Sequence, residues 1–195
     1  MKLKISKLLI SSSILSLPGF LSIFLSLFSI SVHLNTAGAE NYGNYIIFHF
    51  FLIISSILNF GIGKSIAVSI NNYPKNNKEI AFQGIKYTFF IIVIIFFLKI
   101  LISIEKISFL FKLIDSSLTN YFFLGIALSI LYSSFEGIFQ GNQKFKTLSA
   151  FNLIFFSFSI SIPSLMLIYD QKLSLNELIT FSLMIKILTI VLMFL

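Results

Sequence analysis

Charged side chains are rare in this chain, and Lys186 is the one that stands deepest within an apolar stretch. It lies ten residues into the final apolar run, and no acidic residue stands one helical turn away from it. An ammonium group at such a depth in a membrane needs a water-filled cavity, a partner helix or an anionic ligand. We predict that Lys186 faces a hydrated cavity and binds an anionic ligand there.

Four other polar residues lie on helical faces where they could contact a ligand. Asn59 and Lys64 share one face of an earlier apolar run, and Glu136 and Gln140 share a face of another. Lys64 and Glu136 stand near the same end of their runs, so they could instead form a structural ion pair, and Lys64 could extend to the membrane surface. His49, within the same run as Asn59, is more often a packed histidine than a proton carrier.

The chain lacks the motifs of enzymes. It has no Cys, which excludes thiolate metal sites and a Cys nucleophile, and His33 and His49 are too few and too far apart to define a metal site. Gly61 and Gly63 lack the third glycine and the soluble strand of a nucleotide-binding loop. We therefore expect no enzymatic activity, no metal and no cofactor.

Composition places these residues in an integral membrane protein. Of 195 residues, 57% are hydrophobic and 11% are charged, whereas soluble domains carry roughly a quarter charged residues. A net charge of +7 would favour nucleic acid as the partner of a soluble protein. Here the lysines stand between apolar runs, so membrane topology explains them better, and we expect contacts with membrane lipids and none with nucleic acid.

Six apolar runs are long enough to cross the ~30 Å hydrocarbon layer as helices. They are 8–34, 44–70, 81–104, 118–139, 148–169 and 176–195. The first run is about twice as long as a signal-peptide core, so we interpret it as a retained span. The expected fold class is all-α, a polytopic transmembrane bundle of about six spans. Because the last run reaches Leu195 without a polar tail, we expect 1–195 to be a single lobe whose C-terminal counterpart is missing.

The distribution of lysines predicts the orientation of these spans. With a cytoplasmic N-terminus, nine lysines lie on the cytoplasmic side and four on the outer side. Cytoplasmic loops carry the excess of basic residues in membrane proteins. Segments 71–80 and 140–147 are then cytoplasmic, and 35–43, 105–117 and 170–174 face outward. We expect a multi-pass protein of the cell membrane (inner or plasma membrane).

Small residues recur on one side of the fourth run, at Gly125, Ser129 and Ser133. Small residues let membrane helices approach closely, and their hydroxyl groups can form hydrogen bonds between the helices. This side is therefore predicted to be a packed helix contact. Ile126 and Leu131, on other sides of the same run, are predicted to face lipid.

Three segments at the ends of the spans resemble Wzx-type polysaccharide (O-antigen) flippases of the multidrug/oligosaccharidyl-lipid/polysaccharide exporter superfamily. Residues 38–45 (GAENYGNY) resemble the turn after the first helix of these proteins. Residues 59–65 (NFGIGKS) are similar to the G-x-G element that ends the second helix, and 136–146 (EGIFQGNQKFK) to the loop between the fourth and fifth. The order and position of the three segments carry the resemblance, which covers the N-terminal half of the family's pattern.

The resemblance implies one lobe of a MATE-like transporter that moves undecaprenyl-diphosphate-linked oligosaccharide from the cytoplasmic to the outer leaflet. Such transport supplies surface polysaccharide, such as the O-antigen of lipopolysaccharide, with H⁺ or Na⁺ as coupling ion and a second lobe or protomer completing the cavity. A diphosphate in a low-dielectric cavity requires cationic partners. Lys186 and Lys64 are then candidate diphosphate ligands. Asn59 and Gln140 are candidate neutral partners, with Glu136 on the same polar face as Gln140.

Three other hypotheses stay open. A cation-coupled multidrug exporter of the same superfamily would use a buried acidic residue, for which Glu136 is the candidate. A membrane-embedded transferase acting on polyprenyl lipids would require clustered Asp, Glu or His at one membrane face, which the sequence lacks. A non-transporting remnant or assembly partner is the third, because of the abrupt end at Leu195.

Overall fold

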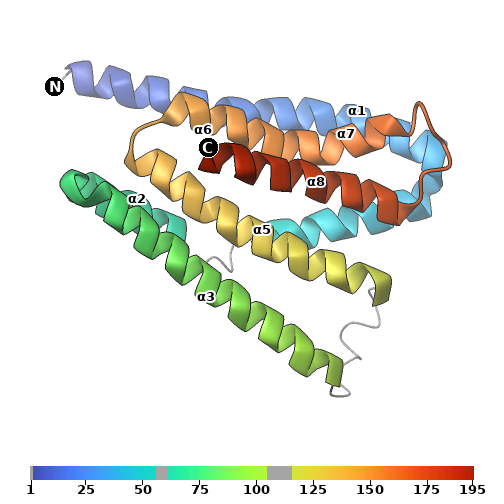
Figure 1. Cartoon of the computed structure of the whole chain (residues 1–195). Helices are drawn as coiled ribbons and strands as arrows, with labels where there is room; N and C mark the ends of the chain where they lie inside the picture. Colours follow the sequence, from blue (N-terminus) through green and yellow to red (C-terminus); the bar gives the residue numbers. More distant parts are fainter. Residues whose placement is uncertain (1, 56–60, 105–115) are drawn as a thin grey trace. The chain divides into compact units, whose positions relative to one another are not determined.

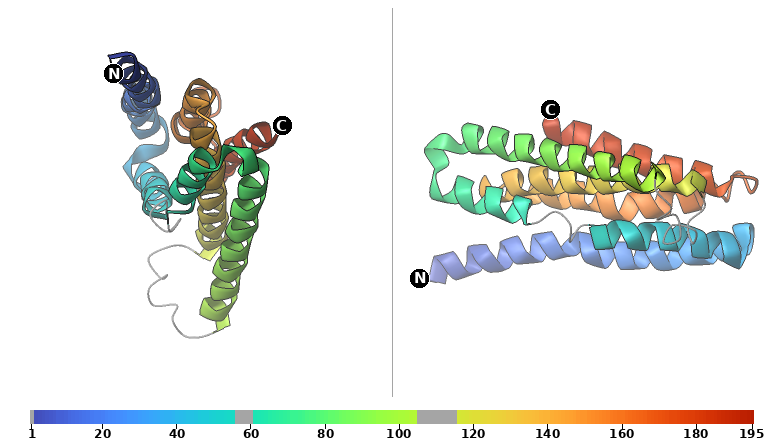
Figure 2. Two further views of the ribbon diagram at one scale, coloured as in Figure 1. Left: turned by 90° about the vertical axis from the view of Figure 1, so that its left-hand side faces the viewer. Right: turned by 90° about the horizontal axis from the view of Figure 1, so that it is seen from below.

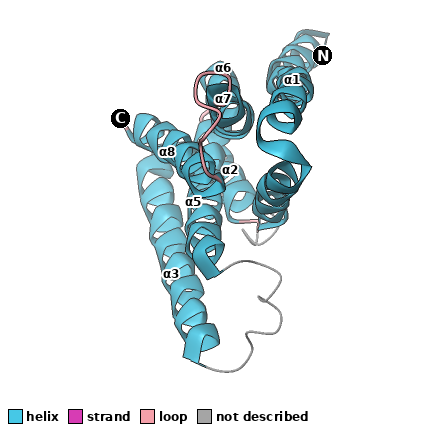
Figure 3. Ribbon diagram, turned by 90° about the vertical axis from the view of Figure 1, so that its right-hand side faces the viewer, coloured by secondary structure: helices cyan, strands magenta, loops and turns pink. Residues whose placement is uncertain are grey.

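The computed structural model describes residues 2–55, 61–104 and 116–195, and its regular secondary structure over these ranges is entirely helical (Figures 1 and 3). The longer helices are α1 (Lys2–Ser55), α2 (Ile62–Asn72), α3 (Asn77–Ile104), α5 (Ser116–Gly141) and α8 (Leu175–Phe194). Shorter elements are the 3₁₀ turn η2 (Pro74–Asn76), α6 (Phe145–Asn152), the π-helix η3 (Leu153–Phe158) and α7 (Ser159–Met166). The all-α prediction is confirmed.

Within the described ranges, five helical stretches are long and apolar enough to cross a membrane. They are Ser16–Phe50, Pro74–Ile100, Leu118–Gly141, Phe145–Met166 and Leu175–Phe194. The last four correspond to the third to sixth predicted spans. The chain therefore has the helices of a multi-pass membrane protein.

The first two predicted spans differ from the observed helices. Helix α1 is interrupted at Gly38, whose φ of 82° and ψ of 167° are not helical. Glycine adopts positive φ without steric cost, and the chain turns back there (light blue in Figure 1). The predicted loop at 35–43 is thus a turn with one non-helical residue. The predicted second span, 44–70, is divided between the end of α1 and α2, and residues 56–60 lie outside the described ranges.

The chain forms two compact units. The first unit contains residues 1–45 and 142–195, and the second contains residues 46–141. That 1–195 forms a single lobe and lacks a C-terminal counterpart stays a prediction.

In the second unit, α2 and α3 form a helical hairpin closed by η2, and both helices pack against α5 (Figure 2). Small residues on both helices make the contact between α2 and α5. A Cβ added at Gly63 of α2 would collide with the Ser133 carbonyl, and one added at Gly137 of α5 would collide with the Gly63 carbonyl. Gly141 similarly packs against Ile70. The backbones of α2 and α5 are therefore in direct contact.

The predicted packed side of the fourth span is confirmed. Gly125 packs against Leu52, and Ser129 and Ser133 are buried. Ser129 donates a hydrogen bond to the Gly125 carbonyl over 2.9 Å. The prediction that Ile126 faces lipid is wrong, because its side chain is only 5% exposed. Since α5 packs against both α2 and α3, it buries more than one side.

In the first unit, α7 and α8 form a second hairpin, whose loop is drawn in pink in Figure 3. A capping box starts α8: the Ser174 hydroxyl accepts from the Glu177 backbone N–H, and the Glu177 carboxylate accepts from the Ser174 N–H over 2.7 Å. Such caps satisfy backbone donors that the first turn leaves free. The α7–α8 loop and the turn in α1 lie at the same end of this unit (Figures 1 and 2).

Candidate functional site

Lys186 lies in α8, and its side chain is only 3% exposed. Its Nζ donates a hydrogen bond to the Phe155 carbonyl over 2.8 Å and stands 4.0 Å from the centroid of the Phe155 ring. A cation over an aromatic face is attracted by the ring quadrupole. The ammonium therefore faces a neighbouring helical segment and not the hydrated cavity that we predicted.

The carbonyl that accepts the Lys186 hydrogen bond belongs to the π-helix η3. Single π-turns within α-helices occur frequently at functional sites. The Phe155 carbonyl in this segment accepts a second hydrogen bond, from the Ser159 hydroxyl over 2.6 Å. A single backbone oxygen thus partly compensates the charge of Lys186 in place of a carboxylate.

Hydrogen-bonding capacity remains unused around Lys186. An ammonium has three N–H donors, and among the described residues only the Phe155 carbonyl accepts from this one. Ser182 stands one helical turn earlier on α8, and its fully buried hydroxyl has no partner in the described part of the chain. We call Lys186, Ser182, Ser159 and Phe155 the lysine centre. A buried positive charge with spare donors is suited to an anionic ligand.

The structure places Lys64, Glu136 and Gln140 in the second unit. The Lys64 side chain is exposed on α2, and Gln140 donates to the Glu136 carboxylate over 3.0 Å within α5. The Glu136 partner that the structure shows is thus Gln140 and not Lys64. Asn59 lies outside the described residues.

Sequence reasoning missed a second buried polar cluster in the first unit. His33 is fully buried, its Nδ1 lies 3.2 Å from the Ser164 hydroxyl, and its ring lies 5.3 and 5.1 Å from those of Tyr42 and Tyr45. The Tyr45 hydroxyl donates to the Ile160 carbonyl over 2.9 Å. These contacts connect the parts of α1 before and after Gly38 to α7. The signal that could have revealed the cluster is the placement of His33 and the two tyrosines on either side of Gly38.

Comparisons with known proteins add no assignment. No protein-family model matches the chain, and searches of curated proteins and of solved structures found no match either.

Proposed function

We propose that this chain is one lobe of a transporter that moves undecaprenyl-diphosphate-linked oligosaccharide across the membrane. The observation that carries the proposal is the lysine centre, a buried ammonium for which the described residues supply one hydrogen-bond acceptor, the Phe155 carbonyl. The resemblance of the three segments at the helix ends to polysaccharide flippases supports it.

The lysine centre supplies what a diphosphate headgroup needs inside a membrane. A diphosphate carries about two negative charges, and removing them from water is costly unless a cation and hydrogen-bond donors replace the lost solvent. Lys186 provides the charge, and the Ser182 hydroxyl provides a neutral donor one turn away. The diphosphate takes the place of the Phe155 carbonyl as the partner of Lys186 when the contact between α8 and η3 opens.

Glu136 favours a second candidate, a cation-coupled multidrug exporter. Its carboxylate lies within a candidate span, is partly buried and is held by Gln140. A coupling H⁺ or Na⁺ would bind to it. If Glu136→Gln abolished export of cationic drugs by cells that express the chain, this alternative would be preferred.

Lipid binding by the purified chain tests the leading proposal. In native mass spectrometry from detergent, the chain should retain undecaprenyl diphosphate in preference to zwitterionic phosphatidylethanolamine. Lys186→Met should weaken this binding at least about tenfold, because a hydrogen bond to a charged group is worth about 1.5–3 kcal/mol. Lys172→Met, at an exposed position in the α7–α8 loop, is the matched control. Equal retention of the two lipids by the wild type would refute the proposal.

The proposed direction of transport requires a cytoplasmic N-terminus. Within the second unit, Ile70 packs against Gly141, so the α2–α3 turn and the end of α5 lie at one end, as the lysine distribution requires. Because the chain has no Cys, single cysteines report sidedness directly.

We expect that Asn76→Cys, in the exposed η2 turn, is not labelled by an impermeant maleimide in intact cells and is labelled after permeabilisation. Asp170→Cys, in the exposed α7–α8 loop, should be labelled in intact cells and serves as the control. The reverse pattern would show that the orientation is inverted.

A further inference from the structure

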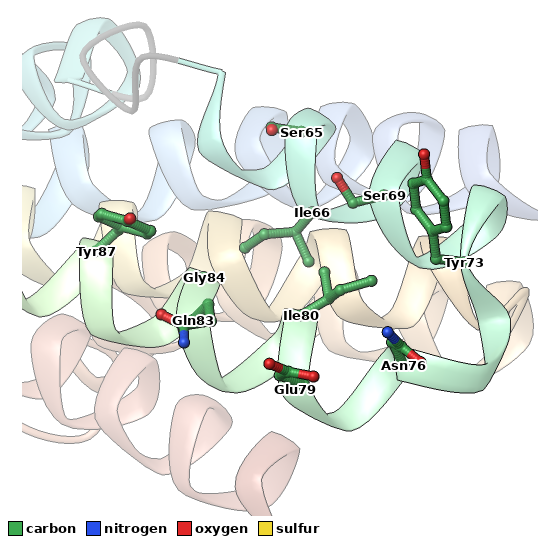
Figure 4. A pocket seen from close by; sticks show the side chains of 10 residues that line it. All are labelled: Ser65, Ile66, Ser69, Tyr73, Asn76, Glu79, Ile80, Gln83, Gly84 and Tyr87. Carbon is green, nitrogen blue, oxygen red and sulfur yellow. The ribbon is translucent and has the colours of Figure 1, made fainter.

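A groove with both polar and apolar lining residues runs between α2 and α3 in the second unit (Figure 4). Its volume is about 410 Å³, which is within the usual range for small-molecule sites. Its polar groups are hydroxyls, amides and one carboxylate, and Ile66 and Ile80 contribute apolar surface. The polar groups come from Ser65, Ser69, Tyr73, Asn76, Glu79, Gln83 and Tyr87. Gly84 forms part of the floor, where a Cβ would collide with the Ile66 side chain, so the two helices approach closely beneath the groove.

The lining of this groove selects a neutral, hydroxyl-rich ligand. Glu79 is its only charged lining residue, and a carboxylate disfavours an anion. Four exposed lysines immediately next to lining residues disfavour an organic cation: Lys64, Lys75, Lys78 and Lys86. Hydroxyls and amides both donate and accept hydrogen bonds, as the hydroxyls of a sugar do.

Two tyrosines give the groove surfaces against which a ring can pack. Tyr87 and Tyr73 stand near opposite ends of the groove in Figure 4, and their side chains are 64% and 67% exposed. The faces of exposed aromatic rings are apolar and can cover the C–H face of a sugar ring, while polar side chains bind its hydroxyls.

We propose that the α2–α3 groove binds a sugar of the lipid-linked substrate. This inference rests on the proposed function and specifies which part of the substrate this hairpin recognises. The sugar and the diphosphate are then recognised by separate side chains.

A tryptophan reporter can measure the sugar contribution, because the chain has no Trp of its own. Tyr87→Trp protein in lipid nanodiscs would be titrated with undecaprenyl diphosphate carrying N-acetylglucosamine and with undecaprenyl diphosphate alone. We expect the sugar-bearing lipid to shift the Trp emission and to bind about five- to tenfold more tightly, as one or two additional hydrogen bonds predict. Glu79→Gln or Gln83→Ala in this background should remove most of the difference. Phe82→Trp, on α3 outside the groove and 67% exposed, is the control reporter.

The outcomes separate this inference from the proposed function. A sugar-dependent difference that persists in both Glu79→Gln and Gln83→Ala, or no such difference in the starting protein, would overturn the groove assignment. The proposed function would stand in either case if the lipid without sugar still bound in a Lys186-dependent manner. If neither lipid bound, both proposals would be refuted.

Discussion

Replacing Lys186 with glutamate should reduce transport of lipid-linked oligosaccharide at least about tenfold. The substitution removes a charge-assisted hydrogen bond worth about 1.5–3 kcal/mol and places a second negative charge where the diphosphate binds. It also sets a carboxylate against the Phe155 carbonyl, which accepts the Lys186 hydrogen bond at 2.8 Å. Transport would be followed as surface polysaccharide in flippase-deficient cells that express the chain with a complementary second lobe.

A graded series distinguishes loss of function at this position from misfolding. Lys186→Met keeps a long side chain without charge, so it should insert slightly better, because lysine at mid-span costs about 2.5–3.5 kcal/mol on insertion scales. It should nevertheless transport poorly. Lys186→Arg keeps the charge and should retain more transport than Lys186→Met. Lys172→Ala is the exposed control. Wild-type transport by Lys186→Glu would show that Lys186 is structural.

A single methyl group at Gly137 should destabilise the second unit by about 1–3 kcal/mol, the usual cost of overpacking. The added Cβ would collide with the carbonyl oxygen of Gly63. That oxygen belongs to the backbone, so α2 or α5 must move and the close contact between them is lost. The measurement is an SDS titration in mixed micelles followed by circular dichroism, in which Gly137→Ala should unfold at a lower SDS fraction.

Gly43→Ala is the matched control for this substitution. A Cβ at Gly43 in α1 would meet no atom within 4 Å. Alanine is intrinsically a better helix former than glycine by about 1 kcal/mol, so Gly43→Ala should be neutral or slightly stabilising. Equal destabilisation by both substitutions would contradict a backbone contact specific to Gly63 and Gly137.

Helix positions and packed faces were predictable from this sequence because they depend on composition and spacing. The apolar run at 176–195 became α8, and the small residues Gly125 and Ser133 became helix contacts. The sharp turn at Gly38 was less predictable, because a single residue with positive φ reverses a chain that is otherwise helical on both sides. Ile126 was misassigned because the sequence does not reveal how many neighbours surround a helix.

In the candidate sites too, the position of a residue within its helix was predictable from the sequence, whereas its contacts with other helices were not. The depth of Lys186 could be read from its position in the last apolar run. Its partner could not, because the Phe155 carbonyl is a backbone atom of a π-helix and has no side-chain signature. The groove depends on the pairing of two helices, because Ser65 and Ser69 of α2 and Glu79 and Gln83 of α3 line it together (Figure 4). The two serines are four residues apart, as are Glu79 and Gln83. This spacing is common in helices, so neither pair by itself indicates a site.

The most direct test of transport by this chain is restoration of surface polysaccharide in a flippase-deficient cell. The chain would be expressed alone and together with the second half of a flippase of the same superfamily as a separate polypeptide. Cysteine labelling at Asn76→Cys and Asp170→Cys would verify insertion in each case. We predict restoration in at least one arrangement and its loss with Lys186→Glu. If the correctly inserted protein restored no surface polysaccharide, either alone or with the second half, the result would contradict the proposed function.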